Sequence, residues 1–296
     1  MVFKPRPCPT RWEGIAVALW IVLLDFLLVV WAIRRPADTF KFVLIVLMVA
    51  SLPLLAHIVY RTWSAFTLEY WVDRNAITVH WANIRQIIPL QAVERVVAGR
   101  TLAADRPGLL AWPAPFLRSS AVPGLGRIHL CATQPPVDCL FLETADELYA
   151  LSPAAPDLFM ATVQERYSMG PAQVVQFERR RLSIWDRMLP SDALGIWLLG
   201  TGLLGVLVLF GALMISFPDL PDVLTVRYNS AGVPEEISAK GALFRLPIIG
   251  TLAWVGNGLL GLWLMARRQR TGAYMLWGGA IVVQVASMFA LISLIT

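Results

Sequence analysis

Positions 14–33 read Gly-Ile-Ala-Val-Ala-Leu-Trp-Ile-Val-Leu-Leu-Asp-Phe-Leu-Leu-Val-Val-Trp-Ala-Ile, an apolar run with a single charged side chain. A helix of about 20 residues crosses the hydrocarbon core of a bilayer, which is about 30 Å thick. Because lipid offers no hydrogen bonds to a backbone, such a run is expected to be helical. Four more runs of this kind follow, at Phe42–Tyr60, Leu194–Phe217, Leu246–Met265 and Ala273–Ile295. The sequence therefore predicts a multi-pass membrane protein with five spans.

Residues Arg61–Ala193 separate the second run from the third and differ from the runs in composition. They include 13 Arg, no Lys and 13 Asp plus Glu, so the segment is neutral and the net charge of +5 lies beside the spans. The whole chain has 15% charged residues, whereas a soluble protein has about 25%. We therefore expect a soluble insert within a membrane protein, and no nucleic acid partner.

The basic residues beside the spans predict the orientation of the chain. They form three clusters: Lys4, Arg6 and Arg11; Arg179, Arg180, Arg181 and Arg187; and Arg267, Arg268 and Arg270. Such clusters favour the cytoplasmic side. This places the N-terminus and the insert inside, and the loop Pro218–Arg245 and the C-terminus outside, in the inner or plasma membrane of a cell. Arg34, Arg35 and Lys41 lie in the first outer turn and oppose this orientation.

Short β-type runs separated by turn residues predict seven strands in the insert: Phe66–Val72, Ala76–Trp81, Ile84–Pro89, Val93–Ala98, Arg127–Ala132, Val137–Glu143 and Glu147–Leu151. The second and third runs form a hairpin through Ala82-Asn83. Ala155–Tyr167 has a helical pattern. The predicted fold class is an α+β membrane protein. A seven-stranded β-barrel or sandwich with a C-terminal helix is inserted between the second and third of five transmembrane helices.

Two stretches of the insert resemble bacterial PH-like domains. Residues 75–96 hold two strands joined by a tight turn, with Ile-Pro-Leu closing the second strand, as in that family. Residues 149–159, Tyr-Ala-Leu-Ser-Pro-Ala-Ala-Pro-Asp-Leu-Phe, resemble the family's sequence before its C-terminal helix. The resemblance implies a PH-like domain at residues 61–170. It does not imply phosphoinositide binding, because Lys is absent and the basic residues of the long excursion are dispersed, at Arg100, Arg106 and Arg118.

The loop after the third span resembles the bacterial membrane domain of unknown function numbered 1648, which also occurs in toxin-immunity and signalling membrane proteins. The matching residues are Leu220, Pro221, Tyr228, Asn229, Gly232, Pro234, Glu235 and Lys240. Arg227 stands where that family usually has His. The resemblance implies a recognition loop with the candidates Arg227, Tyr228, Asn229, Gly232, Glu235 and Lys240. A structured turn that only connects two spans is the alternative.

Two near-copies of one motif lie inside the third and fourth spans: Gly200-Thr-Gly-Leu-Leu-Gly and Gly256-Asn-Gly-Leu-Leu-Gly. A dinucleotide fingerprint of this form needs a strand before it, so that interpretation is rejected. Small residues let membrane helices approach closely. We therefore expect these spans to pack against each other or a partner through Gly200, Gly202, Gly205, Gly256, Gly258 and Gly261.

Asp25 and His57 are ionisable residues within predicted spans. Such residues are costly in a bilayer and suggest a functional site. Asp25 lies mid-helix, and the alternative is a neutral Asp that fixes helix packing, with His57 as its partner. A further candidate site is the linker at residues 171–193, in which the stretch Val174–Leu189 sets the apolar residues Leu182, Trp185, Met188 and Leu189 against Arg179, Arg180 and Arg181. This pattern predicts a basic amphipathic linker with an interfacial helix and Trp185 at the lipid headgroups, or a plain basic flank.

The predicted domains are a transmembrane hairpin at 1–60, the PH-like domain at 61–170, the linker at 171–193 and a three-span region at 194–296 with the outer loop 218–245. The function predicted is non-catalytic: sensing, scaffolding or immunity-type signalling through the PH-like domain. The alternative is a transporter or channel accessory subunit that uses Asp25.

No enzyme activity, catalytic residue, cofactor or metal site is predicted. His129 and Cys131 share a strand face, but two candidate ligands do not make a zinc site. The expected partners are membrane lipids, together with another membrane or cytoplasmic protein or a second copy of this chain.

Overall fold

The computed structural model describes residues 1–8, 10–99, 108–122, 126–181, 193–228 and 234–295. The chain divides into two compact units. The first combines Met1–Leu24 with Ser51–Ser183, and the second combines Asp25–Ala50 with Ile184–Thr296.

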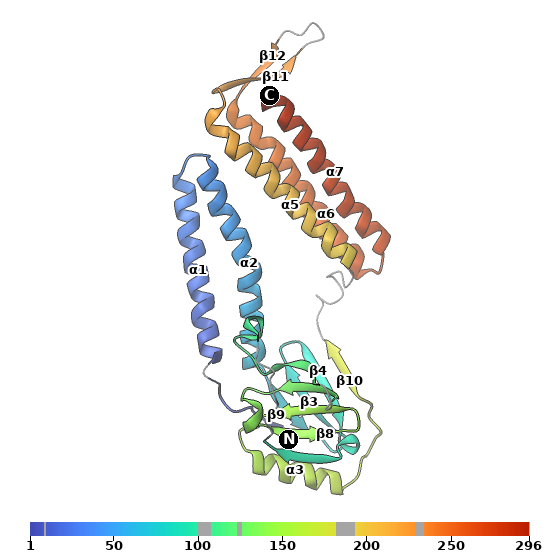
Figure 1. Cartoon of the computed structure of the whole chain (residues 1–296). Coiled ribbons are helices and arrows are strands. Elements are labelled where there is room, and N and C mark those ends of the chain that lie inside the picture. The colour runs from blue at the N-terminus through green and yellow to red at the C-terminus, as the bar shows by residue number, and fades with distance from the viewer. Residues whose placement is uncertain (9, 100–107, 123–125, 182–192, 229–233, 296) are drawn as a thin grey trace. The chain divides into compact units, whose positions relative to one another are not determined.

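Five helices of the described chain are long and apolar enough to cross a membrane (Figure 1): α1 Thr10–Arg34, α2 Thr39–Phe66, α5 Ala193–Ser216, α6 Arg245–Ala266 and α7 Arg270–Ile295. This confirms the prediction of five apolar helices. The largest difference is at the end of α2, which continues past Tyr60 to Phe66. Neither Gly nor Pro interrupts residues 61–66, so the helix extends into the segment predicted to be soluble.

The domain of the first unit contains two five-stranded sheets. One has the order β1-β2-β3-β4-β10, with bounds Val2–Phe3, Glu69–Val72, Ala76–Trp81, Ile84–Pro89 and Glu178–Arg181. The other has the order β5-β8-β9-β7-β6, with bounds Arg95–Ala98, Leu140–Glu143, Glu147–Leu151, Gly126–Cys131 and Leu117–Val122. Neighbouring strands are antiparallel except β7 and β9, which run parallel.

The predicted strand number of seven is wrong, because these sheets hold ten strands. All seven predicted runs contain a strand, and the additions are β1, β6 and β10. Each addition lies at the edge of a sheet, where a strand pairs on one side only and needs little apolar alternation. In the described part of the chain the two sheets share no strand pair, so the domain is a sandwich and not a closed barrel.

The core of the domain lies between the sheets and is closed by helix α3, Pro156–Ser168. Ile77 from the first sheet and Leu142 from the second are fully buried in it. Phe159 of α3 packs edge-on against Phe3 of β1, with ring centroids 5.2 Å apart. The N-terminal strand therefore contributes to the same core as the C-terminal helix.

The second unit includes helices α5, α6 and α7, which lie side by side (Figure 1). Leu209 and Leu213 of α5 pack with Leu291 of α7 in a buried cluster. Between α5 and α6 the chain forms a hairpin of two antiparallel strands, β11 Val223–Tyr228 and β12 Pro234–Ala239. The loop after the third span is thus structured where it is described.

Candidate functional site

A cluster of polar side chains lies within the domain where β7 and β9 run parallel. The strand register places His129 directly opposite Tyr149. Their rings stack, with centroids 4.9 Å apart and planes 17° from parallel. His129 is only 7% exposed and Tyr149 is fully buried, so both rings are held inside the protein.

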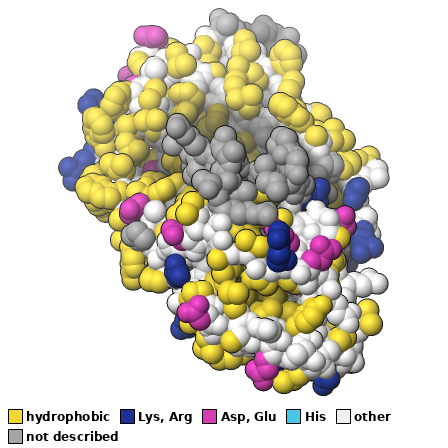
Figure 2. Space-filling view, turned by 60° about the horizontal axis from the view of Figure 1, so that its bottom comes forward, with side chains coloured by type: hydrophobic (Ala, Val, Ile, Leu, Met, Phe, Trp, Pro, Cys, Tyr) yellow, Lys and Arg dark blue, Asp and Glu magenta, His cyan; other side chains and the backbone are white. Residues whose placement is uncertain are grey.

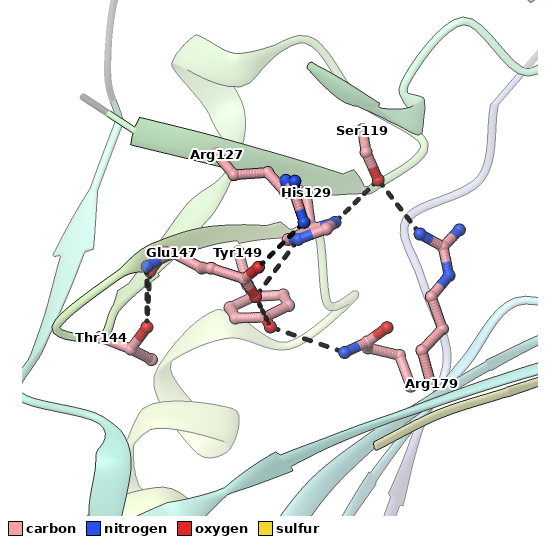
Figure 3. Close-up of polar contacts among 8 residues, drawn as sticks. Ser119, Arg127, His129, Thr144, Glu147, Tyr149 and Arg179 are labelled. Carbon is pink, nitrogen blue, oxygen red and sulfur yellow. Dashed lines mark hydrogen bonds and ion pairs between the residues drawn. The ribbon is translucent and has the colours of Figure 1, made fainter. Parts of the chain in front are cut away.

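The polar cluster connects the two sheets, as Figure 3 shows. Ser119 of β6 shares a 2.7 Å hydrogen bond between its Oγ and Nδ1 of His129. From the first sheet, Arg179 of β10 donates from Nη1 to the same Oγ at 3.3 Å. Gln86 of β4 donates from Nε2 to the Tyr149 hydroxyl at 3.5 Å, which is a weak contact. Side chains from five strands therefore connect the two sheets at this cluster.

Glu147 provides the negative charge of the cluster. Its carboxylate accepts a short hydrogen bond from the Tyr149 hydroxyl. Nε2 of His129 lies 3.3 Å from Oε2, and Nη1 of Arg127 lies 3.8 Å from Oε1. Nε2 of His129 makes no well-aligned hydrogen bond to the described residues, so its approach to Glu147 is a close polar contact that becomes an ion pair only when the imidazole is protonated.

Burial and charge act in opposite directions on Glu147. Burial raises the pKa of this carboxyl, but the hydrogen bond from Tyr149, the contact with His129 and the charge of Arg127 together lower it. The net effect is a pKa below the usual range, so Glu147 is ionised at neutral pH. Burial and the hydrogen bond to Glu147 both raise the pKa of Tyr149, so its hydroxyl keeps its proton and acts as a donor.

Glu147 also lines a surface cleft of 360 Å³, which we call the acidic cleft. Its other charged lining residues, Glu94 and Asp146, are exposed and acidic. Phe177, 48% exposed, supplies an apolar wall. No Lys or Arg lines the cleft among the described residues. The cleft therefore suits a cationic group better than a phosphate.

The face of the molecule that is turned forward in Figure 2 bears charges of both signs. Figure 2 shows basic and acidic side chains mixed with apolar ones on this face, with no continuous basic patch. A lipid headgroup site on such a face would need clustered basic residues.

A second polar cluster joins the domain to helix α2 within the first unit. The guanidinium of Arg61 donates to three backbone carbonyls: Leu117 at 2.8 Å, Ala111 at 2.6 Å, and Ala114. A planar guanidinium presents its donors in a fixed fork, which suits several carbonyls at once. The segment 108–117 is thereby attached to the end of α2.

Neighbouring side chains strengthen this joint. Thr10 of α1 donates to the carbonyl of Pro113 at 2.8 Å. His57 lies with Nε2 2.8 Å from the carbonyl oxygen of Leu110, which can only accept. His57, predicted as an intramembrane polar residue, therefore contacts the domain segment. Asp25 is half-buried in α1, and a functional role for it remains a prediction.

Of the predicted loop residues, the structure places Lys240 in a defined environment. Its Nζ lies 3.0 Å from Asp222 Oδ1 and donates to the carbonyl of Leu220 at 3.3 Å. Only the backbone of Arg227, Tyr228 and Glu235 is described, in β11 and β12. The remaining two candidates, Asn229 and Gly232, lie outside the described residues.

The interfacial-helix prediction is wrong over residues 178–181, which form strand β10. The strand forms because its backbone pairs with β4 in register, Arg179 opposite Gln86. Arg179 contacts Ser119 and lies with its guanidinium 5.8 Å from the centre of the Trp81 ring. Only the backbone of Arg180 and Arg181 is described, and Trp185 lies outside the described residues.

The six glycines of the two near-copies differ in their surroundings. A Cβ on Gly202 would lie 2.5 Å from Trp254 of α6. A Cβ on Gly205 or Gly261 would meet α7 instead, at Gln284 or Trp277. A Cβ on any of the remaining three would meet no described atom within 4 Å: Gly200, Gly256 and Gly258. The close approaches thus involve α7 as well as the predicted pair of helices.

Residues 68–167 match a family model described as a bacterial PH domain. The chain carries a bacterial PH domain. Comparisons with curated proteins and with solved structures found no match. The predicted PH-like resemblance is therefore confirmed. Strands β2 to β9 lie within the matched segment, and helix α3 ends one residue beyond it.

Sequence reasoning did not identify the polar cluster of the PH domain or the role of Arg61. His129 was noted only as a possible zinc ligand, and among the described residues no group of three metal-binding side chains occurs. The available signal was the alternation in β9, where Glu147 and Tyr149 share one face of the strand. Their pairing with β7 is a parallel contact that local patterns do not reveal.

Proposed function

We propose that this chain is a non-catalytic membrane protein that holds its PH domain at the membrane as a binding module for another protein. The Arg61 joint carries this proposal, because it attaches the domain backbone directly to a membrane-spanning helix. Such an attachment serves a scaffold, and it is also the physical contact that sensing would require.

The acidic cleft supports a partner segment that carries Lys or Arg. Glu94, Asp146 and Glu147 supply negative charge, and Phe177 supplies an apolar contact for the stem of a long basic side chain. Electrostatic complementarity of this kind favours recognition and fast association. Immunity-type signalling is the more specific form of the proposal, in which the outer hairpin detects a ligand through Arg227.

Site-specific crosslinking in native membranes tests the scaffold proposal. A photoreactive amino acid replaces Ala145 in the acidic cleft, or Val137 as an exposed control position elsewhere in the domain. We expect one protein to be captured in near-stoichiometric amount at position 145 only. The double variant Glu94→Gln, Asp146→Asn should abolish that capture. Equal capture at positions 145 and 137, or capture at position 145 that is unchanged in the double variant, contradicts the proposal that the acidic cleft binds the partner.

The same membranes test the sensing form of the proposal. Arg227→Gln should change the amount of protein captured at position 145 if the outer hairpin communicates with the PH domain. If Arg227→Gln leaves the capture unchanged, Arg227 has no sensing role and the protein acts only as a scaffold.

A reagent specific for activated serines tests the non-catalytic part. Ser119, His129 and Glu147 follow the order of a Ser–His–carboxylate triad. However, Arg179 already donates to the Ser119 hydroxyl, and Ser119 is not among the described residues that line the cleft. We expect no fluorophosphonate adduct. An adduct that disappears in Ser119→Ala would refute the non-catalytic proposal.

A further inference from the structure

The parts of helices α1 and α2 that belong to the first unit enclose an apolar groove of 530 Å³. Ile15, Leu19 and Val22 of α1 line one side, and Leu55 and Val59 of α2 line the other. Both helices are long and apolar enough to span a membrane, so the groove lies at the level of the hydrocarbon chains. Water in such a groove would lack hydrogen-bond partners, whereas an acyl chain would fill it without that cost.

One polar group interrupts the apolar lining. Thr62 is only 7% exposed, and its Oγ1 makes no hydrogen bond to the described residues. Two nearby hydroxyls behave differently: Ser64 of α2 and Thr67, just after α2, each donate to the carbonyl four residues earlier at 2.8 Å. A buried hydroxyl without a partner destabilises the fold. The Thr62 hydroxyl is therefore suited to a polar atom of a molecule in the groove.

A cation lies at the domain-side end of the same groove. The guanidinium carbon of Arg11 is 4.9 Å from the ring centre of Phe66, which lines the groove, and 5.9 Å from that of Trp12. Its Nε is buried and makes no hydrogen bond to the described residues. Arg11 also belongs to the first turn of α1, where the helix dipole favours an anion. The nearest acidic residue along the helix, Glu13, is exposed.

We propose that the groove binds one anionic phospholipid of the surrounding membrane. An acyl chain lies between α1 and α2, the phosphate contacts Arg11, and the Thr62 hydroxyl donates to an ester oxygen of the glycerol. Along the groove, the apolar lining is followed by the Thr62 hydroxyl and then by the Arg11 guanidinium. The acyl chain, the glycerol ester and the phosphate follow one another in the same order in a phospholipid. The lipid site in the groove is separate from the acidic cleft, whose negative charges disfavour a phosphate.

Photolabelling of the full-length protein in phosphatidylcholine vesicles tests this site. The probe is a minor fraction of phosphatidylglycerol with a photoactivatable acyl chain, and labelled peptides are located by mass spectrometry. We expect labelling on α1 and α2, reduced about fivefold by Arg11→Gln, which is the effect of one interfacial basic residue. Arg267→Gln is the matched control, because that guanidinium also lies against a tryptophan at a helix end, 3.9 Å from the ring of Trp263.

A second pair of variants tests the groove without changing charge. Ala18→Phe places a ring in the groove and should abolish labelling, whereas Ala16→Phe on the exposed face of α1 should not. Excess inorganic phosphate should leave labelling unchanged, because the acyl chain supplies much of the binding. Equal labelling in Arg11→Gln and Arg267→Gln, or in Ala18→Phe and Ala16→Phe, overturns the proposal, as does equal labelling by a phosphatidylcholine probe.

Discussion

A single carboxylate, Glu147, has two environments in the PH domain. One oxygen contacts His129 and accepts from Tyr149 inside the sandwich, and the same side chain lines the acidic cleft outside. A ligand that neutralises Glu147 would therefore act directly on the contacts between β7 and β9. This residue connects the proposed binding surface with the stability of the domain.

Glu147→Gln should lower the free energy of unfolding of the domain by about 1 kcal/mol at pH 7, because a charged acceptor is replaced by a neutral one. The folded-state pKa of Glu147 is lowered, so its contribution is present above the ordinary carboxyl pKa, about 4.3, and is lost as the pH falls through the folded value. The difference from wild type should therefore shrink as the pH falls below that ordinary value. Thermal unfolding in detergent micelles, followed by near-ultraviolet circular dichroism, measures it. Asp146→Asn, in the exposed turn, should show no such difference.

Cysteine chemistry gives a second prediction at this scale. Burial raises the pKa of both Cys131 and Cys139 to about 12, and the charge of Asp138 adds to the effect on Cys139. Since the thiolate is the reactive form, both thiols should resist N-ethylmaleimide at pH 7. Intact-mass analysis should show an adduct on Cys8 alone in folded protein, and on all three cysteines after unfolding. Rapid labelling of Cys131 in membranes would show that the sandwich opens.

At the scale of elements, the sequence predicted most accurately those strands that have neighbours on both sides. Ala76–Trp81, Ile84–Pro89 and Glu147–Leu151 agree with β3, β4 and β9 residue for residue. Strand β10 was missed because Glu-Arg-Arg-Arg has no apolar residue, and only its pairing with β4 makes it a strand. Strand β1 is too short to show any period.

The joint between α2 and the PH domain could not be predicted for a related reason. Arg61 meets carbonyls that lie 50 to 56 residues away in the sequence, and backbone carbonyls have no sequence signature. An Arg next to an apolar run ordinarily serves as a flanking charge beside a span. The fold reveals a structural role instead.

Arg61→Lys should loosen the segment 108–117 while leaving the helix intact. A lysine keeps the charge but offers no planar fork, so part of the contact with three carbonyls is lost, about 2 kcal/mol of local stability. Hydrogen–deuterium exchange of the full-length protein measures this loss as faster exchange in that segment. Arg74→Lys is the matched control, because Arg74 donates to the carbonyls of Gly170 and Met169 elsewhere in the domain. Equal exchange in both variants would show that the Arg61 contacts do not hold the segment.

At the scale of the whole molecule, the number of spans and the first sheet restrict the topology. Strand β1 precedes α1 and pairs with β2, which follows α2. The N-terminal strand and the PH domain must therefore lie on one side of the membrane, with α1 and α2 as a hairpin between them. If all five apolar helices span, the turn between α6 and α7 returns to that side, and β11 and β12 lie on the other.

The basic residues then choose the side, and this is the last prediction. We expect the PH domain in the cytoplasm, because the clusters around Lys4, Arg179 and Arg267 all fall on its side of the membrane. In a Cys8→Ser background, a membrane-impermeant maleimide should label Pro221→Cys in intact cells and Gln269→Cys only after the cells are opened. The reverse pattern would place the PH domain outside, where the basic clusters of Arg34 and Lys41 would decide the orientation. Labelling of both positions in intact cells would mean that α6 does not span the membrane.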